Sequence, residues 1–298
     1  MPLFSVIVPT FNRSELLERA LQSVWRQRFD DFEVIVVDDG STDGTLDYLR
    51  SLSGPVRVLT QENKGPGTAR NFGVKSALGD YVAFLDSDDV WFPWTLQAFA
   101  ELIQCHKAPA ILSSHLVEFS QDDELAEVKE TPVKGHHFTD YFTSHRAGYF
   151  VGAGMAVLRR EDLLRTGGFT EKRINAEDHD LVLRMGAAPG FVQIRQPITL
   201  GWRRHEGSAT RNVRQSYEGT AYLIGQERRG AYAGGSTRAR ERRLILTRHI
   251  RPVSLECVRH GMRKEAWELY RASFFWHARL GRWKYLAGFP LQALLPGR

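Results

Sequence analysis

The sequence has little cysteine, and its two cysteines are isolated. Cys105 and Cys257 are the only ones in 298 residues, and neither belongs to a CxxC pair or has a histidine at metal-ligand spacing. This argues against a structural zinc site and fits a reducing compartment.

Long apolar segments are also missing. No stretch of about 18 apolar residues occurs, so we expect no transmembrane helix. The first residues, MPLFSVIVPTFNR, lack the basic segment and the apolar run of a signal peptide. We therefore expect a cytoplasmic protein, either free or held peripherally at the inner membrane face.

The composition that remains is that of a globular protein, with 42% hydrophobic and 25% charged residues. The length predicts two domains, or one large α/β domain with an extension. The net charge of +5 hides an asymmetry, because residues 238–298 carry a surplus of +10. Such a basic region fits nucleic acid, anionic lipid or a solvated helical face.

Strand and helix patterns alternate over the first 115 residues. This alternation predicts an α/β fold with a mostly parallel, Rossmann-like sheet flanked by helices on both faces. Ser14 is expected to be the N-cap of the first helix. The expected strands are 5–9, 32–37, 56–59, 81–85 and 110–114, and the expected helices are 14–27, 44–51, 65–77 and 93–105.

The pattern is looser after Phe119. We expect a hairpin of strands 191–195 and 198–204, and basic helices from Asn212 onward. The other expected elements are a loop at 121–134, a strand at 148–158, and helices at 161–165 and 176–185. The predicted organisation is one α/β domain in two halves (1–115 and 116–210) and a helical C-terminal extension (211–298).

Polar clusters follow three of the predicted strands: Pro9–Asn12, Asp38–Asp43 and Asp86–Asp89. Ligands of open parallel sheets bind at the carboxyl ends of the strands. The three clusters therefore predict a binding site at this edge.

The segment Asp86-Ser-Asp88-Asp89 places three carboxylates within four residues. They repel one another unless something neutralises them, and a hard divalent cation shared with substrate phosphates would do so. The alternative is a polar loop that caps the next helix.

The acids Asp38 and Asp39 end a strand and could accept hydrogen bonds from a base or a ribose. Helix capping is the other interpretation, since Ser41, Thr42 and Asp43 are all good caps. Both can hold together, with Asp43 as the cap and Asp39 as the ligand.

In the segment ENKGPGTARNFG, glycines precede a helix whose open N–H groups suit an anion. Lys64 and Arg70 add positive charge. The alternative is that Arg70 only pairs with a nearby acid.

The segments SVIVPTFNR, VIVVDDGSTDGT, ENKGPGTARNFG and YVAFLDSDD, in this order and spacing, resemble the family 2 glycosyltransferases of the GT-A fold, of the bacterial non-processive type. The resemblance is strong over residues 4–94. It continues more loosely through GGF (167–169), AEDHDL (176–181) and WRRHEGSAT (202–210).

The resemblance implies a role for each matching residue. Asp178 would be the catalytic base and Glu177 would help to bind the acceptor. Asp88, with His205, would hold Mn²⁺ or Mg²⁺. The implied donor-binding residues are Pro9, Thr10, Phe11, Asp39, Lys64, Arg70 and Asp86.

The implied reaction transfers a sugar from a nucleoside diphosphate donor to an acceptor hydroxyl, with inversion at the anomeric carbon. The acceptor would be a saccharide or a lipid-linked molecule in the synthesis of cell-surface polysaccharide or glycoconjugate. Processive relatives carry Q-x-x-R-W and flanking membrane helices. Neither is present here, so we expect the addition of one or a few sugars.

Other interpretations stay open for the acids, the tail and the activity. Glu177 and Asp178 would also suit the first turn of a helix, where the dipole favours acids. The basic tail would be either a membrane-surface region or a helical cap with solvated arginines, and no nucleic-acid motif accompanies it. The rival functions are a sugar nucleotidyltransferase and an inactive homologue that only binds nucleotide sugar.

Overall fold

The computed structural model describes residues 1–205 and 212–294, which divide into two compact units. The first unit comprises Met1–Tyr141, Phe150–Arg173 and Ala188–His205. The second comprises Phe142–Tyr149, Ile174–Ala187 and the C-terminal region, described from Asn212 onward.

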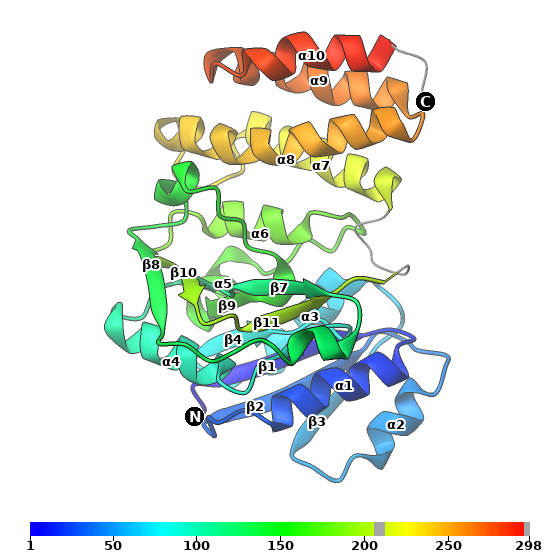
Figure 1. Cartoon of the computed structure of the whole chain (residues 1–298), viewed down its shortest axis with the longest axis vertical. Helices are drawn as coiled ribbons and strands as arrows, with labels where there is room; N and C mark the ends of the chain where they lie inside the picture. The colour runs from blue at the N-terminus through cyan, green and yellow to red at the C-terminus, as the bar shows by residue number, and fades with distance from the viewer. Residues whose placement is uncertain (206–211, 295–298) are drawn as a thin grey trace. The chain divides into compact units, whose positions relative to one another are not determined.

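The first unit is built on an eight-stranded sheet in the order β3-β2-β1-β4-β9-β6-β10-β8 (Figure 1). All its strands run in one direction except β8 and β9, which confirms the mostly parallel sheet. The strands are β1 (Phe4–Thr10), β2 (Phe32–Asp38), β3 (Val56–Thr60), β4 (Tyr81–Phe84), β6 (Ile111–Ser113), β8 (Lys134–Phe138), β9 (Ala156–Arg159) and β10 (Phe191–Gln196).

Helices cover both faces of this sheet because side chains alternate along each strand. Val6 and Val8 of β1 point to one face and share a core with Leu17 and Leu21 of α1. Ile7 points to the other face, where it lies against Gly73 of α3. The helices of this unit are α1 (Ser14–Trp25), α2 (Thr45–Ser51), α3 (Pro66–Ser76), α4 (Thr95–Cys105) and α5 (Arg160–Thr166).

The expected N-cap at Ser14 is wrong, because helix α1 already includes that residue and Arg13 is the cap. No side chain caps the helix there. The N–H groups of Asn12 and Arg13 bind the hydroxyls of Ser41 and Thr45 instead. The chain therefore enters α1 without needing the Ser14 hydroxyl.

The expected hairpin near residue 197 is also wrong. β10 belongs to the large sheet, whereas β11 (Leu200–Arg203) lies in a separate sheet between β5 (Val90–Trp91) and β7 (Leu116–Phe119). The connection is anchored by donors at the start of α4, since Trp94 Nε1 binds the Ile198 carbonyl and Thr95 Oγ1 binds the Thr199 carbonyl. These bonds replace a tight β-turn.

Two further expectations are corrected by short 3-10 helices. Only Ala156–Arg159 of the expected strand 148–158 is extended, because Ala153–Met155 forms such a helix. The expected loop 121–134 contains another at Asp122–Leu125, closed by a capping box between Gln121 and Glu124.

The second unit is helical, as expected from Asn212 onward. Its elements α7, α8, α9 and α10 each contact the next in the chain (Figure 1). Among the described residues, no helix combines the length and apolarity needed to cross a bilayer. The helices are α6 (Glu177–Met185), α7 (Val213–Arg229), α8 (Ala239–Arg259), α9 (Arg263–Arg279) and α10 (Trp283–Leu294), with a 3-10 helix at Phe142–Arg146.

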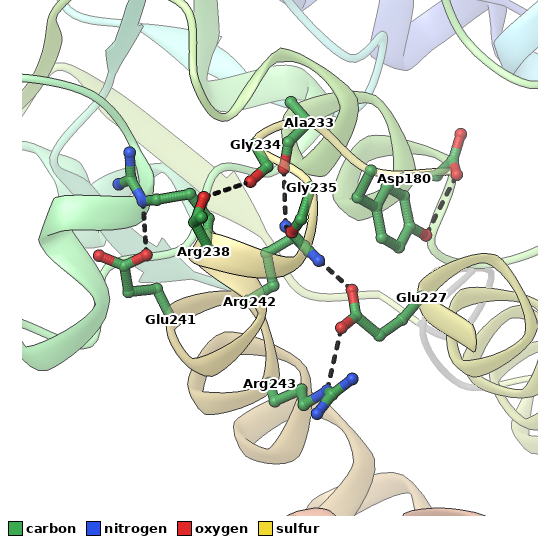
Figure 2. A network of polar contacts seen from close by, with 11 residues as sticks. Asp180, Glu227, Ala233, Gly234, Gly235, Arg238, Glu241, Arg242 and Arg243 are labelled. Atoms are coloured by element: carbon green, nitrogen blue, oxygen red, sulfur yellow. Dashed lines mark hydrogen bonds and ion pairs between the residues drawn. The ribbon is translucent and has the colours of Figure 1, made fainter. Parts of the chain in front are cut away.

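A buried ion pair joins α7 to α8 (Figure 2). The carboxylate of Glu227 accepts from Arg242 Nε at 2.7 Å and from Arg243 Nε at 3.0 Å. Arg242 also donates to the carbonyls of Ala233 and Gly235, so it fixes the loop between the helices. Glu227 and Arg242 are 3% and 2% exposed, which makes the pair sensitive to loss of either partner.

We expect Glu227→Gln to lower the free energy of unfolding by about 3 kcal/mol, because it leaves the Arg242 guanidinium buried without a counter-charge. Urea unfolding followed by circular dichroism measures this. The control Glu256→Gln breaks an exposed pair with Arg259 and should cost less than about 1 kcal/mol. Equal losses in the two variants would contradict the assignment.

Candidate functional site

The loop after β1 presents one exposed ring beside buried neighbours. Pro9 and Thr10 are buried, whereas the Phe11 side chain is 42% exposed. Asn12 follows in a left-handed conformation, with φ of 51°, and its Oδ1 accepts from the Thr42 N–H at 2.7 Å. The β1 and β2 loops are thus tied together, and Phe11 is accessible for stacking.

Asp39 fixes the next loop. Its Oδ1 accepts from Gln61 Nε2 at 2.6 Å and the Lys64 N–H at 2.9 Å, and its Oδ2 accepts from the Gly65 N–H at 2.8 Å. Three donors hold this 3% exposed carboxylate, so it shapes the loop that carries Lys64. Asp38 accepts from the N–H groups of the turn that follows β2.

At the end of β4, Asp86 lies against Arg70. Arg70 Nη2 is 2.5 Å from Asp86 Oδ1, and the Arg70 residue is only 4% exposed. A Cβ on Gly154 would come within 2.7 Å of Asp86 Oδ2, so a larger residue there would displace the carboxylate. Arg70 therefore pairs with Asp86 at the end of β4.

Asp88 lies between two nitrogen groups. Its Oδ2 is 2.8 Å from His205 Nε2 and 2.6 Å from Arg13 Nη1. His205 therefore lies beside Asp88, as the resemblance implied for two ligands of one metal. The remainder of the WRRHEGSAT segment, residues 206–210, lies outside the described residues.

Asp89, the third acid of this segment, is buried, and the resemblance assigned it no role of its own. It accepts from the Arg203 N–H at 2.9 Å, while Arg203 Nε donates to the Asp88 carbonyl at 3.1 Å. Burial, and then the charges of Asp86 and Asp88, raise the pKa of Asp89 well above its usual range. The sequence analysis also gave no role to Arg13 and Arg203, although both lie in segments that carry the resemblance, SVIVPTFNR and WRRHEGSAT.

The first unit therefore brings the predicted donor residues to one edge of its sheet, because β2, β1 and β4 are neighbours there. Trp91 and Trp94, which follow the carboxylates, are buried core residues.

Asp88 and His205 are suitable ligands for a divalent ion. A carboxylate and an imidazole side by side suit Mn²⁺ or Mg²⁺ when substrate phosphates complete the coordination shell. Within residues 1–205 and 212–294, no three His, Cys, Asp or Glu side chains come together as a full metal site. The chain would thus supply part of the shell, and Arg13 already provides positive charge there.

In the second unit, Glu177 and Asp178 occupy the first turn of α6, as the helix-dipole interpretation expected. Ala176, just before them, has a φ of 142°, which is strained for a residue with a Cβ. The backbone there is crowded, since a Cβ on Gly219 of α7 would come within 1.9 Å of the Asn175 carbonyl oxygen. The start of α6 is therefore tightly held by α7.

A histidine pair adjoins Asp178. Asp178 Oδ1 accepts from the His179 N–H at 2.6 Å and lies 2.9 Å from His179 Nδ1. The His179 ring packs on that of His249, with centroids 4.3 Å apart. Both contacts go to Oδ1, and no other described residue donates to Oδ2. Asp178 is thus held in place with one oxygen available.

Electrostatics keep Asp178 ionised. Burial raises its pKa, but the charge and hydrogen bonds of His179 outweigh burial and lower the pKa of Asp178 to about 2. Burial alone would lower the pKa of His179, but the charge and hydrogen bond of Asp178 outweigh burial, so the pKa of His179 is raised. Burial and the charge of His179 lower the pKa of His249 to about 3.

Comparison with known proteins agrees with this architecture. A model of glycosyl transferase family 2 matches residues 5–166. The amylovoran biosynthesis glycosyltransferase AmsB of Erwinia amylovora is 32% identical over 65% of this chain and 68% of AmsB. A Campylobacter jejuni GalNAc(5)-diNAcBac-PP-undecaprenol beta-1,3-glucosyltransferase is 44% identical over 30% of each chain.

Solved structures show the fold. S. aureus TarS 1-349 in complex with UDP-GlcNAc matches with a TM-score of 0.60 and 20% identity, over 94% of this chain and 92% of TarS 1-349. The Pyrobaculum calidifontis mannosyltransferase PcManGT, in complex with GDP-Man and Mn²⁺, matches with a TM-score of 0.58 and 19% identity, over 98% and 86% of the two chains.

The sheet, with its carboxylates at the strand ends, has the arrangement of the GT-A fold. The chain belongs to glycosyl transferase family 2. It spans 40%, 67% and 15% of the lengths of the first three curated relatives that it matches.

We expect His249 to make the protein sensitive to acid. Its folded pKa of about 3 lies below the unfolded value of about 6.5, so the unfolded state takes up the proton first. Stability should fall as the pH drops below about 6.5, by about 2 kcal/mol at pH 5. The stability that Asp178 contributes is lost only below about pH 4. The stability that His179 contributes is fully present below about pH 6.5.

The variant His249→Phe should show a smaller fall in melting temperature between about pH 7.5 and pH 5 than the wild type. The control is His260→Phe, because the His260 side chain is half exposed. An identical acid loss in wild type and His249→Phe would show that His249 is not the group responsible.

Proposed function

We propose that this protein is an inverting, divalent-metal-dependent glycosyltransferase that moves a sugar from a nucleoside diphosphate sugar to an acceptor hydroxyl. The observation that carries the proposal is the pairing of Asp88 with His205 and Arg13, beside the Arg70–Asp86 pair. This arrangement places a carboxylate and an imidazole, which can bind the metal of a metal–diphosphate complex, next to the permanent positive charges of two arginines.

The donor would lie at the strand ends of the first unit. Phe11 would pack on the base, and Asp39 would hydrogen-bond the base while it holds the loop of Lys64. Pro9 and Thr10 would line the nucleotide pocket, Lys64 and Arg70 would face the phosphates, and Asp86 would support the sugar or the metal shell. This assigns the donor to residues 1–115 and the acceptor to residues 116–210.

Asp88 and His205 would hold Mn²⁺ or Mg²⁺, which supplies positive charge to the leaving diphosphate when it is bound. The Mn²⁺ named with PcManGT supports this choice of ions. Lys64, Arg70 and Arg13 are the chain's own positive groups for the same developing charge.

Asp178 would remove the proton of the acceptor hydroxyl as that oxygen bonds to the anomeric carbon and the bond to the diphosphate breaks. A single displacement of this kind inverts the configuration. His179 holds one oxygen of the carboxylate, which leaves the other for the acceptor. Glu177 would bind the acceptor on the same turn of α6.

The names of two relatives support the acceptor class. AmsB is named for amylovoran biosynthesis, and the Campylobacter enzyme for a substrate linked to PP-undecaprenol. We infer a saccharide or lipid-linked acceptor in the synthesis of cell-surface polysaccharide or glycoconjugate, with the C-terminal helices in peripheral contact with the membrane.

We expect Asp88→Ala to weaken metal-dependent donor binding by about tenfold or more, since a charge-assisted ligand is lost. The measurement is calorimetry with a panel of UDP and GDP sugars, with and without Mn²⁺. The control is Asp47→Asn, whose side chain is 84% exposed. Unchanged metal-dependent binding in Asp88→Ala would exclude Asp88 as the ligand, and no donor binding by the wild type would overturn the proposed function.

We expect Asp178→Asn to bind the donor as the wild type does but to lose about 10²–10⁴-fold in turnover, the usual contribution of a general base. Sugar transfer to the acceptor, measured with the donor found in the panel, tests this. Melting temperature and donor affinity serve as controls for folding. Turnover within a few-fold of the wild type would assign the base elsewhere.

A further inference from the structure

Helix α10 carries an apolar stripe on its exposed side. Trp283, Leu291 and Leu294 are 64%, 67% and 71% exposed and recur with Ala287 on one face of the helix. The opposite face is buried, through Tyr285, Leu286, Phe289 and Ala293. A helix that is apolar on both faces normally has a partner on each.

An arginine cluster adjoins this helix. Arg282 immediately precedes Trp283, and Arg248 and Arg251 belong to α8, whose Ser254 Oγ lies 2.8 Å from the Tyr285 hydroxyl of α10. Among the described residues, no carboxylate pairs with any of the three, and the Nε atoms of Arg251 and Arg282 are buried without a hydrogen-bond partner. Unpaired cations gathered in one place favour an anionic ligand.

Buried His277 of α9 lies beside the same cluster, because its carbonyl accepts from the Arg282 N–H at 2.9 Å and its ring packs on that of Tyr285 in α10, with centroids 4.4 Å apart. It is 0% exposed, and neither ring nitrogen has a hydrogen-bond partner within the described ranges. Burial, and then Arg282 and Arg251, lower the pKa of His277 to about 4. Burial, Arg251 and Arg248 likewise lower the pKa of Arg282. These groups therefore lie within one another's fields, and an anion would relieve their repulsion.

Helix α9 repeats the combination of aromatic and basic residues. Phe275 is 73% exposed, and Arg271 and Arg279 stand four residues before and after it on the same helix face. From residue 269 to the end, the sequence has five basic residues and no acidic one.

This charge pattern selects among the occupants of the apolar stripe. A second copy of the chain would place like charges against one another, which disfavours association. An anionic lipid surface attracts the same charges, and exposed Trp, Leu and Phe side chains beside basic residues are typical of helices that lie in a membrane interface.

We propose that α10 and the arginine cluster bind an anionic membrane surface, with the stripe of Trp283, Leu291 and Leu294 among the lipid chains and Arg248, Arg251 and Arg282 on lipid phosphates. This proposal identifies the surface that makes the membrane contact suggested under the proposed function, and it rests on that function for its biological purpose. It is independent of donor chemistry, so each can fail without the other.

The test is co-sedimentation of the full chain with vesicles of phosphatidylcholine alone or mixed with phosphatidylglycerol. The wild type should bind the anionic vesicles more tightly and release them at high salt. Each of Arg251→Gln and Arg282→Gln should weaken binding about fivefold, and Leu291→Ser about tenfold. The matched controls are Arg50→Gln and Leu164→Ser, which change exposed side chains of the first unit.

Three results would overturn the proposal. These are equal binding to neutral and anionic vesicles, unchanged binding by the cluster and stripe variants, or competition by dissolved inorganic phosphate without any vesicle binding, which would indicate a soluble anion site. Sedimentation velocity adds a fourth, because a dimer lost in Leu291→Ser would assign the stripe to a second copy. Donor binding, measured in parallel, reports separately on the proposed transferase.

Discussion

The concentration of carboxylates at the ends of β2 and β4 is the constraint around which the first unit is arranged. Asp38 ends β2 and Asp39 follows it, and Asp86, Asp88 and Asp89 follow β4. Like charges this close destabilise a fold unless each is neutralised. Backbone N–H groups satisfy the first pair, and Arg70, Arg13 and the N–H of Arg203 serve the acids after β4. The same arrangement leaves Asp88 and His205 beside one another for a ligand.

Local patterns predicted most of the first unit because its strands and helices alternate and bury regular faces. These patterns failed where contacts between residues far apart in the sequence determine the course of the chain. The course of β11 depends on donors from Trp94 and Thr95, about a hundred residues away in sequence. The acids of the site were predictable because they lie in short motifs. Their partners Arg13 and Arg203 also lie in motif segments, but only the folded sheet shows which acid each of them contacts.

The second unit shows the same limit at a single residue. The AEDHDL segment marks Asp178, and helix periodicity places it in the first turn of α6. His249 lies on α8, 70 residues after His179, and nothing near it in sequence points to a role. Its ring nevertheless packs on His179, which fixes Asp178 Oδ1. The environment of the proposed base is therefore a product of helix packing and could not be inferred from the motif.

The second unit also carries the proposed lipid-binding surface, and this has a consequence for the acceptor. A lipid-linked acceptor is confined to the plane of the bilayer, so an enzyme in solution meets it rarely. Binding of α10 and the arginine cluster to that plane would raise the local acceptor concentration, much as a tether raises effective concentration. A surface of this kind recognises lipid phosphates and the apolar interior of the bilayer, so it does not need to distinguish one sugar from another. Specificity is then left to the residues between Phe119 and Arg173, where the family motifs are weakest.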